Sequence, residues 1–204
     1  MKYMREVEKQ FQSPSYPVFR SYELESFKMG KKYKKRLIHL LLSNGRIERI
    51  TRGVYTFHND VTVVGFAFSP FYYGFEDALS IRGLSLQGTN SIVVTFRNVR
   101  QGVRSFKSRN YLVRRVPQDL FFGYNLLKRG KFWIPVSDLE KTIIDMMYFD
   151  HYIRDELWPG ILKELDMERL RDHLKRYKKG FRDEMLKTIS EERKKVKQSP
   201  RNSP

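Results

Sequence analysis

Apolar residues recur at helical spacing in the first third of the chain, most clearly over residues 31–43. On a helical wheel, one face of this segment collects the apolar residues Tyr33, Leu37, Leu40 and Leu41. The residues that point away from this face are Lys31, Lys32, Lys35 and His39, with Lys34 and Arg36 on the flanks. The pair Asn44-Gly45 follows as a helix end, because both residues tolerate the left-handed conformation. The pattern predicts a helix with one buried face and one basic face.

Shorter elements flank this helix. Residues 2–11 show an amphipathic helical pattern, and Ser21 is a suitable N-cap for a short helix through residue 27. Alternating residues predict strands over 46–50 and 54–57, joined by the tight turn Thr51-Arg52-Gly53. Helix, turn, helix and β-hairpin is the order of a winged helix-turn-helix, whose second helix enters a DNA major groove. We assign residues 1–58 to such a DNA-binding domain.

The chain from residue 59 to residue 189 predicts a mixed α+β domain. Residues 61–68 are ambiguous, because their β-branched content favours a strand whereas Val61, Val64 and Phe68 also fit one helical face. A helix is expected over 75–82, ending at Gly83, and strands are expected over 91–96, 110–116 and 132–134. A loop or hairpin around Gly102 is predicted between the first two of these strands.

The last third of the chain is predominantly helical in pattern. The capping box Ser137-Asp138-Leu139-Glu140 opens a helix through about residue 148, with Lys141 and Asp145 spaced as an i,i+4 ion pair on its outer side. Further helices are expected over 159–165, after the N-cap Asp166, and over 181–189. Residues 190–204 lack periodicity and predict a disordered basic tail. The fold class is therefore α+β: an N-terminal winged helix-turn-helix, then a domain with a small sheet and several C-terminal helices.

Composition narrows the class of protein. The chain has 204 residues, and 40% of them are hydrophobic, which is enough for a packed core. It has no cysteine, its four histidines are scattered, and it lacks phosphate-binding glycine loops, so we expect neither a metal nor a cofactor. The N-terminus lacks the apolar segment of a signal peptide, and the longest apolar run, residues 61–75, is too short to cross a bilayer. We expect a cytoplasmic protein without a membrane partner.

The basic residues are clustered. The formal net charge is +17. Residues 28–52 hold nine basic residues against Glu48 alone, and residues 97–115 hold seven basic residues and no acid. Such clusters are typical of proteins that bind polyanions. Charge alone does not distinguish DNA from RNA, an acidic protein or a membrane surface.

Two sets of basic residues are the candidate binding sites. The predicted helix and hairpin supply the DNA-binding set: Lys31, Lys32, Lys34, Lys35, Arg36, His39, Arg49 and Arg52. A second set, for a partner or a further nucleic-acid surface, consists of Arg97, Arg100, Arg104, Lys107, Arg109, Arg114 and Arg115. Seven like charges on one hairpin would repel one another, which a counter-surface would relieve. The alternative for this set is a solvated basic loop.

Catalytic interpretations of the sequence have less support than the binding interpretations. A nuclease could gather carboxylates around Mg²⁺, the candidates being Glu76, Asp77, Asp138, Glu140 and Asp145. Helix capping and ion pairing explain these acids more simply. Unpaired bases could stack on the aromatic residues Phe71, Tyr72, Tyr73, Phe75, Phe121, Phe122 and Tyr124, although core packing is the more usual role. We expect a protein that is not an enzyme.

Three sequence blocks occur in an order that suggests a family. They are residues 44–55 (NGRIERITRGVY), residues 72–84 (YYGFEDALSIRGL), and Phe122-Gly123 followed by residues 134–145 (IPVSDLEKTIID). Together they resemble the wing, the helix after the linker, and the strand and Glu-Lys helix of the AbiEi family of type IV toxin–antitoxin antitoxins and related regulators. The resemblance implies a winged helix that represses its own operon at operator repeats, with DNA contacts at Lys31, Lys32, Lys35, Arg36 and Arg52. It also implies a non-enzymatic C-terminal domain that helps to neutralise a nucleotidyltransferase toxin.

The sequence therefore predicts a DNA-binding transcriptional regulator, acting as an autoregulating repressor and antitoxin. Its partners would be double-stranded operator DNA, bound as a homodimer on repeats, and a nucleotidyltransferase toxin. Four alternatives stay open: an RNA-binding module that uses residues 97–115, a stand-alone regulator without a toxin, a metal-dependent nuclease, and a pure interaction protein.

Overall fold

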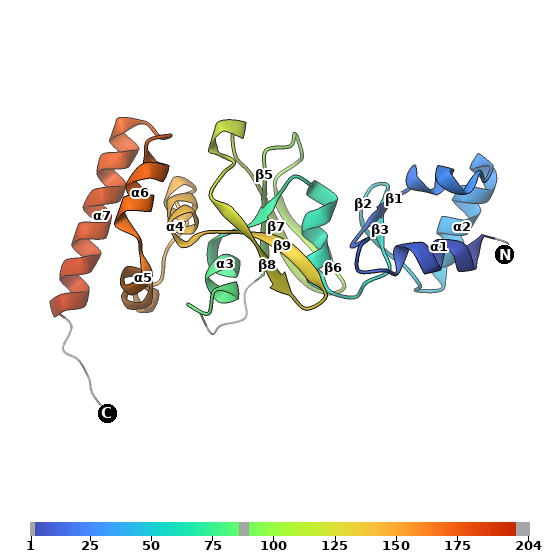
Figure 1. Cartoon of the computed structure of the whole chain (residues 1–204), viewed down its shortest axis with the longest axis horizontal. Helices are drawn as coiled ribbons and strands as arrows, with labels where there is room; N and C mark the ends of the chain where they lie inside the picture. The colour runs from blue at the N-terminus through green and yellow to red at the C-terminus, as the bar shows by residue number, and fades with distance from the viewer. Residues whose placement is uncertain (1–2, 86–89, 199–204) are drawn as a thin grey trace, which may run out of the picture.

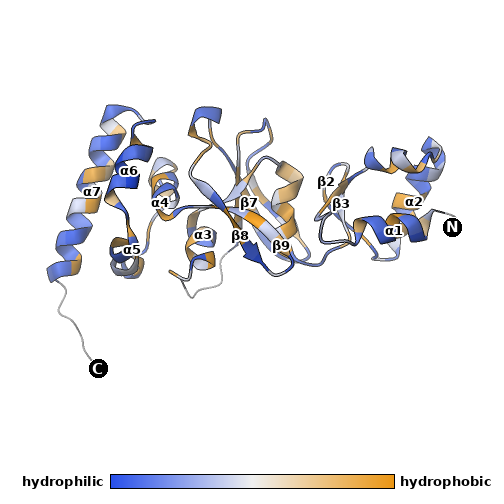
Figure 2. Ribbon diagram, viewed as in Figure 1, coloured by the Kyte–Doolittle hydropathy of each residue, from blue (hydrophilic) through white to orange (hydrophobic). Residues whose placement is uncertain are grey.

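A computed structural model describes residues 3–85 and 90–198 as a mixed α+β protein. Three regions lie in a row along the molecule (Figure 1). The N-terminal helices and a small sheet occupy one end, a six-stranded sheet lies in the middle, and a group of helices forms the other end. Hydrophobic residues gather on the strands of the middle region and on the sides of the helices that face their neighbours (Figure 2).

The N-terminal region combines three helical segments with a three-stranded antiparallel sheet. Its elements are α1 (Met4–Phe11), β1 (Phe19–Arg20), the 3₁₀ helix η1 (Glu23–Phe27), α2 (Lys31–Ser43), β2 (Glu48–Thr51) and β3 (Val54–Thr56). The strand order is β1-β3-β2, and Phe11, Leu24 and Leu37 are among the residues that form the core of this region. The predicted helices and hairpin are present with small shifts of their ends; Lys2, where the first helix was expected to begin, lies outside the described residues.

Two details of this region differ from the prediction. Leu40 is only half-buried, because α2 packs through the row of Leu37, Ile38, Leu41 and Leu42 and thereby turns Leu40 to the edge of the contact. Ser21 does not cap η1, which begins after Tyr22 without a side-chain cap. The Ser21 amide instead donates to the Gly53 carbonyl at 2.9 Å, which ties the start of η1 to the turn between β2 and β3.

The central sheet has the strand order β6-β7-β5-β4-β9-β8. Its strands are β4 (Tyr72–Tyr73), β5 (Ser91–Thr95), β6 (Gly102–Phe106), β7 (Arg109–Arg115), β8 (Tyr124–Arg129) and β9 (Phe132–Ser137). β5 is parallel to β7 and β4 is parallel to β9, whereas the other neighbours are antiparallel. The three predicted strands are present, and β6 forms the expected hairpin with β7. The edge strand β8 was not predicted, because its first three residues are all exposed and show no alternation.

One face of the sheet is covered by the segment whose conformation was ambiguous. Residues Val61–Phe68 form the 3₁₀ helix η2, so of the two alternatives left open the helical one is present. Val64 and Phe68 are buried in one hydrophobic cluster together with Ile50 and Val54 of the β2–β3 hairpin. A single cluster therefore crosses the proposed domain boundary at residue 58.

Helices α3 (Phe75–Ile81) and α4 (Leu139–Tyr148) lie against the other face of the sheet. Beyond them, α6 (Met167–Leu174) and α7 (Lys179–Gln198) pack on α4, and α5 (Trp158–Glu164) packs on α7. Short 3₁₀ turns lie at Gln118–Leu120 and Asp155–Leu157. The predicted disordered tail is wrong as far as residue 198, because α7 continues to Gln198. Val196 still packs against the core seven residues after Ile189, and Lys195 pairs with Glu192 at 2.6 Å. Residues 199–204 lie outside the described residues. No helix within the described residues combines the length and the apolar character needed to cross a membrane.

Candidate nucleic-acid interface

The solvent side of α2 carries a basic stripe, formed by Lys31, Lys32, Lys35, Arg36 and His39, all of which are exposed. The first turn of α2 contains no acidic residue. Its lysines therefore add their charge to the positive end of the helix dipole. Free amides, the dipole and lysine charges at one helix end together favour an anionic partner.

Lys34, which belongs to the predicted DNA-binding set, is held within the protein instead. Its ammonium group lies 2.7 Å from Glu25 Oε1 in η1, and its side chain is only 16% exposed. The hydrogen bond and the charge of Lys34 hold the pKa of the Glu25 carboxyl below its usual value. Lys34 thus links η1 to α2, while the basic stripe remains open to solvent.

The β2–β3 hairpin is anchored on one side and open on the other. Gly53 in its turn has a φ of +75°, a conformation that glycine adopts without strain. Ile50 and Val54 are buried against the central sheet, whereas Arg49 and Arg52 are exposed. The hairpin therefore presents its arginines from a fixed backbone.

The second basic set does not form one surface. Arg104 on β6 lies on the sheet face that is covered by η2, with its guanidinium carbon 4.9 Å from the centroid of the Phe68 ring. Arg114 on β7 stacks over Phe149, 5.6 Å from that ring centroid, on the helix-covered face. Alternation along the strands sends the two side chains to opposite faces. The expectation of one continuous basic hairpin is therefore wrong.

The other members of this set are also dispersed. Lys107 pairs with Glu48 of β2 at 3.3 Å, and Arg115 Nη1 donates to Asn98 Oδ1 at 2.8 Å. Arg109 is exposed at the start of β7. Their separation and local partners relieve the repulsion that these residues would add on one hairpin.

Three arginines of this set meet two arginines of the N-terminal region around a hollow of about 520 Å³. We call it the arginine cleft, after its lining residues Arg20, Arg52, Arg97, Arg100 and Arg104. None of the described residues that line it is acidic. Arg20 was missed because it stands alone in the sequence; only the pairing of β1 with β3, which sets Arg20 opposite Val54, brings it beside the hairpin turn.

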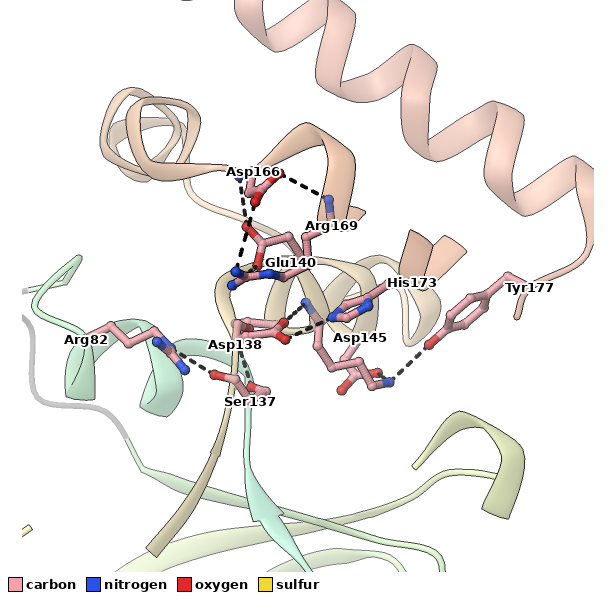
Figure 3. A network of polar contacts seen from close by, with 11 residues as sticks. Arg82, Ser137, Asp138, Glu140, Asp145, Asp166, Arg169, His173 and Tyr177 are labelled. Atoms are coloured by element: carbon pink, nitrogen blue, oxygen red, sulfur yellow. Dashed lines mark hydrogen bonds and ion pairs between the residues drawn. The ribbon is translucent and has the colours of Figure 1, made fainter. Parts of the chain in front are cut away.

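A separate polar network lies between the sheet and the C-terminal helices (Figure 3). Lys141 and Asp145, which were expected on the outer side of α4, form an ion pair in which both side chains are fully buried. Tyr72 Oη donates to Asp145 Oδ2 at 2.7 Å, and Lys141 Nζ donates to Tyr177 Oη at 3.0 Å. The expectation is wrong because α4 is enclosed from several directions, so that every residue from 139 to 146 is buried.

The start of α4 also differs from a capping box. Asp138 is the N-cap, since its Oδ1 accepts from the Lys141 amide at 2.7 Å, and its Oδ2 lies 2.9 Å from His173 Nε2. The Ser137 hydroxyl contacts Thr142 Oγ1 at 2.6 Å instead. Glu140 accepts from the backbone amide of residue 166 at 2.9 Å and thereby joins α4 to the start of α6.

Burial dominates the electrostatics of this network. It lowers the pKa of Lys141 and raises the pKa of Asp145, while the attraction between the two charges opposes both shifts. Burial likewise raises the pKa of Tyr72. Neither Lys141 nor Asp145 has exposed surface through which a substrate could reach it. The network therefore fits a structural role.

The remaining carboxylates considered for a nuclease are also engaged. Glu76 pairs with His151, and Asp77 Oδ1 lies 3.3 Å from Arg129 Nη1. Within the ranges that the structure describes, no three histidine, aspartate or glutamate side chains are arranged to hold a metal ion. Among the aromatic residues considered for base stacking, the core buries Phe71, Tyr72, Tyr73 and Phe75.

Two exposed features thus form the candidate site: the basic stripe of α2, and the arginine cleft beside the β2–β3 turn. The basic stripe was predicted from the sequence. The predicted DNA-binding set also contained Lys34, which is paired with Glu25 instead. The arginine cleft combines residues from both predicted sets with one that neither contained. No protein-family model and no curated protein matches the chain.

Proposed function

We propose that this protein binds duplex DNA through α2 and the β2–β3 hairpin and acts as a transcriptional regulator. The order of the N-terminal elements and the strand order β1-β3-β2 support a winged helix-turn-helix arrangement. In that arrangement α2 is the helix that enters the major groove, and the hairpin is the wing that contacts the backbone or the minor groove.

The basic stripe of α2 is the observation that carries the proposal. Lys31, Lys32, Lys35 and Arg36 are exposed on one side of the helix, whereas the neighbouring Lys34 is paired with Glu25. Lysine contacts to phosphates supply affinity that is largely independent of sequence and falls steeply with salt. Specificity would then come from two copies on an inverted repeat about one helical turn apart, or from DNA shape.

The resemblance to the AbiEi family supports a narrower form of the proposal. In this form the protein represses its own operon and acts as the antitoxin of a nucleotidyltransferase toxin. Co-expression with a nucleotidyltransferase encoded beside this gene tests the second part. Restored growth would support the antitoxin role, and continued growth arrest would leave a regulator without that toxin.

The DNA-binding proposal is tested by a salt-titrated binding assay. The duplex upstream of the protein's own gene is compared with a scrambled duplex and with RNA of the same length. We expect preference for the upstream duplex and a steep linear fall of log K with log salt concentration. Preference for structured or single-stranded RNA would instead favour an RNA-binding module.

A pair of charge reversals locates the contact. Lys32→Glu with Lys35→Glu should weaken binding to every duplex by roughly a hundredfold at 0.15 M salt, because two phosphate contacts are lost and two repulsions are added. Lys194→Glu with Lys197→Glu on α7 makes the same change in net charge and should alter binding little. Equal losses in both variants would mean that only the overall charge matters, and would contradict the assignment of α2.

A further inference from the structure

We propose that the arginine cleft binds the phosphate backbone of the same duplex, so that the central domain extends the DNA contact beyond the wing. The inference rests on the proposed DNA-binding function and deepens it. A winged helix acting alone would confine the DNA contacts to residues 1–58. The cleft adds contacts from β6 and from the loop that precedes it.

The fold brings arginines from different segments of the chain together at the cleft. The five arginines reach the cleft from four segments: Arg20 from β1, Arg52 from the β2–β3 turn, Arg97 and Arg100 from the loop after β5, and Arg104 from β6. A run of charges that is only solvated consists of residues that are close together in the sequence. Here the fold assembles the charges from distant parts of the chain at one concave site, where their potentials add.

The charges of the cleft arginines lack paired carboxylates among the described residues. Other cations of the two hairpin regions have acidic partners: Lys107 lies 3.3 Å from Glu48, and Arg46 lies 3.0 Å from Glu8. Among the described residues, no carboxylate lies within 4.0 Å of a guanidinium nitrogen of the five cleft arginines, and none lines the cleft. An anion bound there would relieve the repulsion between them.

Neighbouring groups hold two of the cleft guanidinium groups in position. Arg97 Nη1 donates to the Ser69 carbonyl at 3.3 Å, and Arg104 Nη2 donates to the Arg100 carbonyl at 2.7 Å. The guanidinium group of Arg104 stacks on the Phe68 ring. Arg104 also hydrogen-bonds to the Tyr111 side chain. These contacts orient the guanidinium groups without neutralising them, and they use only part of the five N–H donors of each guanidinium. A guanidinium with free donors is suited to bidentate contacts with phosphate.

The position of the cleft identifies which phosphates it meets. Arg52 belongs both to the wing turn and to the cleft lining. A duplex whose backbone contacts the wing therefore continues past the other cleft arginines. Among the described residues, the lining contains no Asn or Gln side chain, which are common readers of adenine. Guanidinium groups can also read guanine, so an equal loss of binding for all duplex sequences is the result that identifies backbone contact, which positions a protein on DNA without reading its sequence.

The experiment uses the full chain and a duplex that extends beyond the operator on both sides. Arg97→Gln with Arg100→Gln removes two exposed cleft charges. We expect the slope of log K against log salt to become shallower by about 2, and binding at 0.15 M salt to weaken roughly 30-fold, equally for all duplex sequences. Arg109→Gln with Arg193→Gln, two exposed arginines outside the cleft, should leave the slope unchanged. Thermal unfolding of each variant verifies that the fold is retained.

Hydroxyl-radical footprinting gives a second readout. The cleft variant should lose backbone protection at one flank of each bound copy, whereas Lys32→Glu with Lys35→Glu should lose the whole footprint. Arg97→Lys with Arg100→Lys should keep the slope, because the charge is retained, but bind more weakly, because lysine lacks the planar fork.

Each failure has its own signature. If the cleft variant keeps the slope and the footprint while the α2 variant loses binding, the inference is overturned and the proposed function stands. If the wild-type protein binds no duplex, both are overturned. If a nucleoside triphosphate at constant ionic strength abolishes the difference between the wild-type protein and the cleft variant, the cleft is a site for a free nucleotide and not for the DNA backbone.

Discussion

Lys141 Nζ and Asp145 Oδ1 form an ion pair across one turn of α4, and neither side chain has any exposed surface. The pair is completed by hydrogen bonds from Tyr72 to the aspartate and from the lysine to Tyr177. It joins the sheet, α4 and the loop before α7. Such a pair is costly to break, because removing one partner leaves a buried charge without compensation.

The first prediction concerns this pair. Lys141→Met should lower the free energy of unfolding by roughly 3–5 kcal/mol, because Asp145 stays buried and unpaired. Lys141→Met with Asp145→Leu should recover much of that loss, since neither charge is then present. Urea unfolding with linear extrapolation at pH 7 measures both.

The exposed pair of Lys187 and Glu191, 3.9 Å apart on α7, provides the control. Lys187→Met should change the free energy of unfolding by less than about 0.5 kcal/mol. A loss for Lys141→Met no larger than this would contradict the burial of the pair.

A second prediction follows from the close approach of Gly123 to α4. Gly123 has a φ of +69°, and a Cβ placed there would lie 2.9 Å from Lys141 Cβ. Gly123→Ala should therefore cost roughly 2–4 kcal/mol, of which about 1–2 come from the left-handed backbone and the rest from crowding. Gly45 has a similar φ of +62°, but a Cβ at that position would meet no atom of the described residues within 4 Å, so Gly45→Ala should show only the backbone part. Equal losses in urea unfolding would argue against the close approach.

The third prediction is a pH dependence at Glu76. Burial by itself would raise the pKa of Glu76, but the hydrogen bond with His151 and the charges of His151 and Arg154 outweigh burial and lower it. A folded-state pKa below the unfolded value of about 4.3 means that ionised Glu76 stabilises the fold above that pH. This contribution disappears as the pH falls through the folded-state pKa.

Glu76→Gln should accordingly lower the urea midpoint at pH 7. The difference from the wild-type protein should shrink as the pH is lowered toward about 3, where the wild-type carboxyl is also neutral. A difference that kept its full size in acid would show that the side chain acts through packing and not through its charge.

The fourth prediction separates two adjacent lysines of α2. Lys35→Ala should weaken DNA binding and make the salt slope shallower by about 1, because an exposed cation is lost. Lys34→Ala should change the slope far less, because Lys34 is already paired with Glu25. The same salt titration measures both variants. A larger effect at Lys34 would mean that the ion pair opens when DNA binds.

Local patterns predicted a large part of the fold. The limits of α2 followed from its apolar periodicity and the Asn44-Gly45 stop, and β5 followed from its β-branched run. The same periodicity predicted which lysines of α2 face the solvent, because exposure on a helix that packs through a single face is a local property. The wheel placed Lys34 on the flank of the helix, but its pairing with Glu25 was not predictable, since Glu25 lies in a different element.

Local patterns in the sequence were sufficient for most of the element types, the mixed α+β class and the basic stripe of α2, because these depend on residues within one or two turns of each other. The tertiary packing set what covers each face of the helices and of the sheet, through contacts between distant segments. It buried Lys141 and Asp145 by enclosing α4, extended α7 through contacts of Val196, and divided the second basic set between two sides of a sheet. It also placed Arg20 and Arg52 beside Arg104 in the arginine cleft. The periodicity of the sequence could not predict this arrangement, because the arrangement depends on strand pairing between segments far apart in the chain.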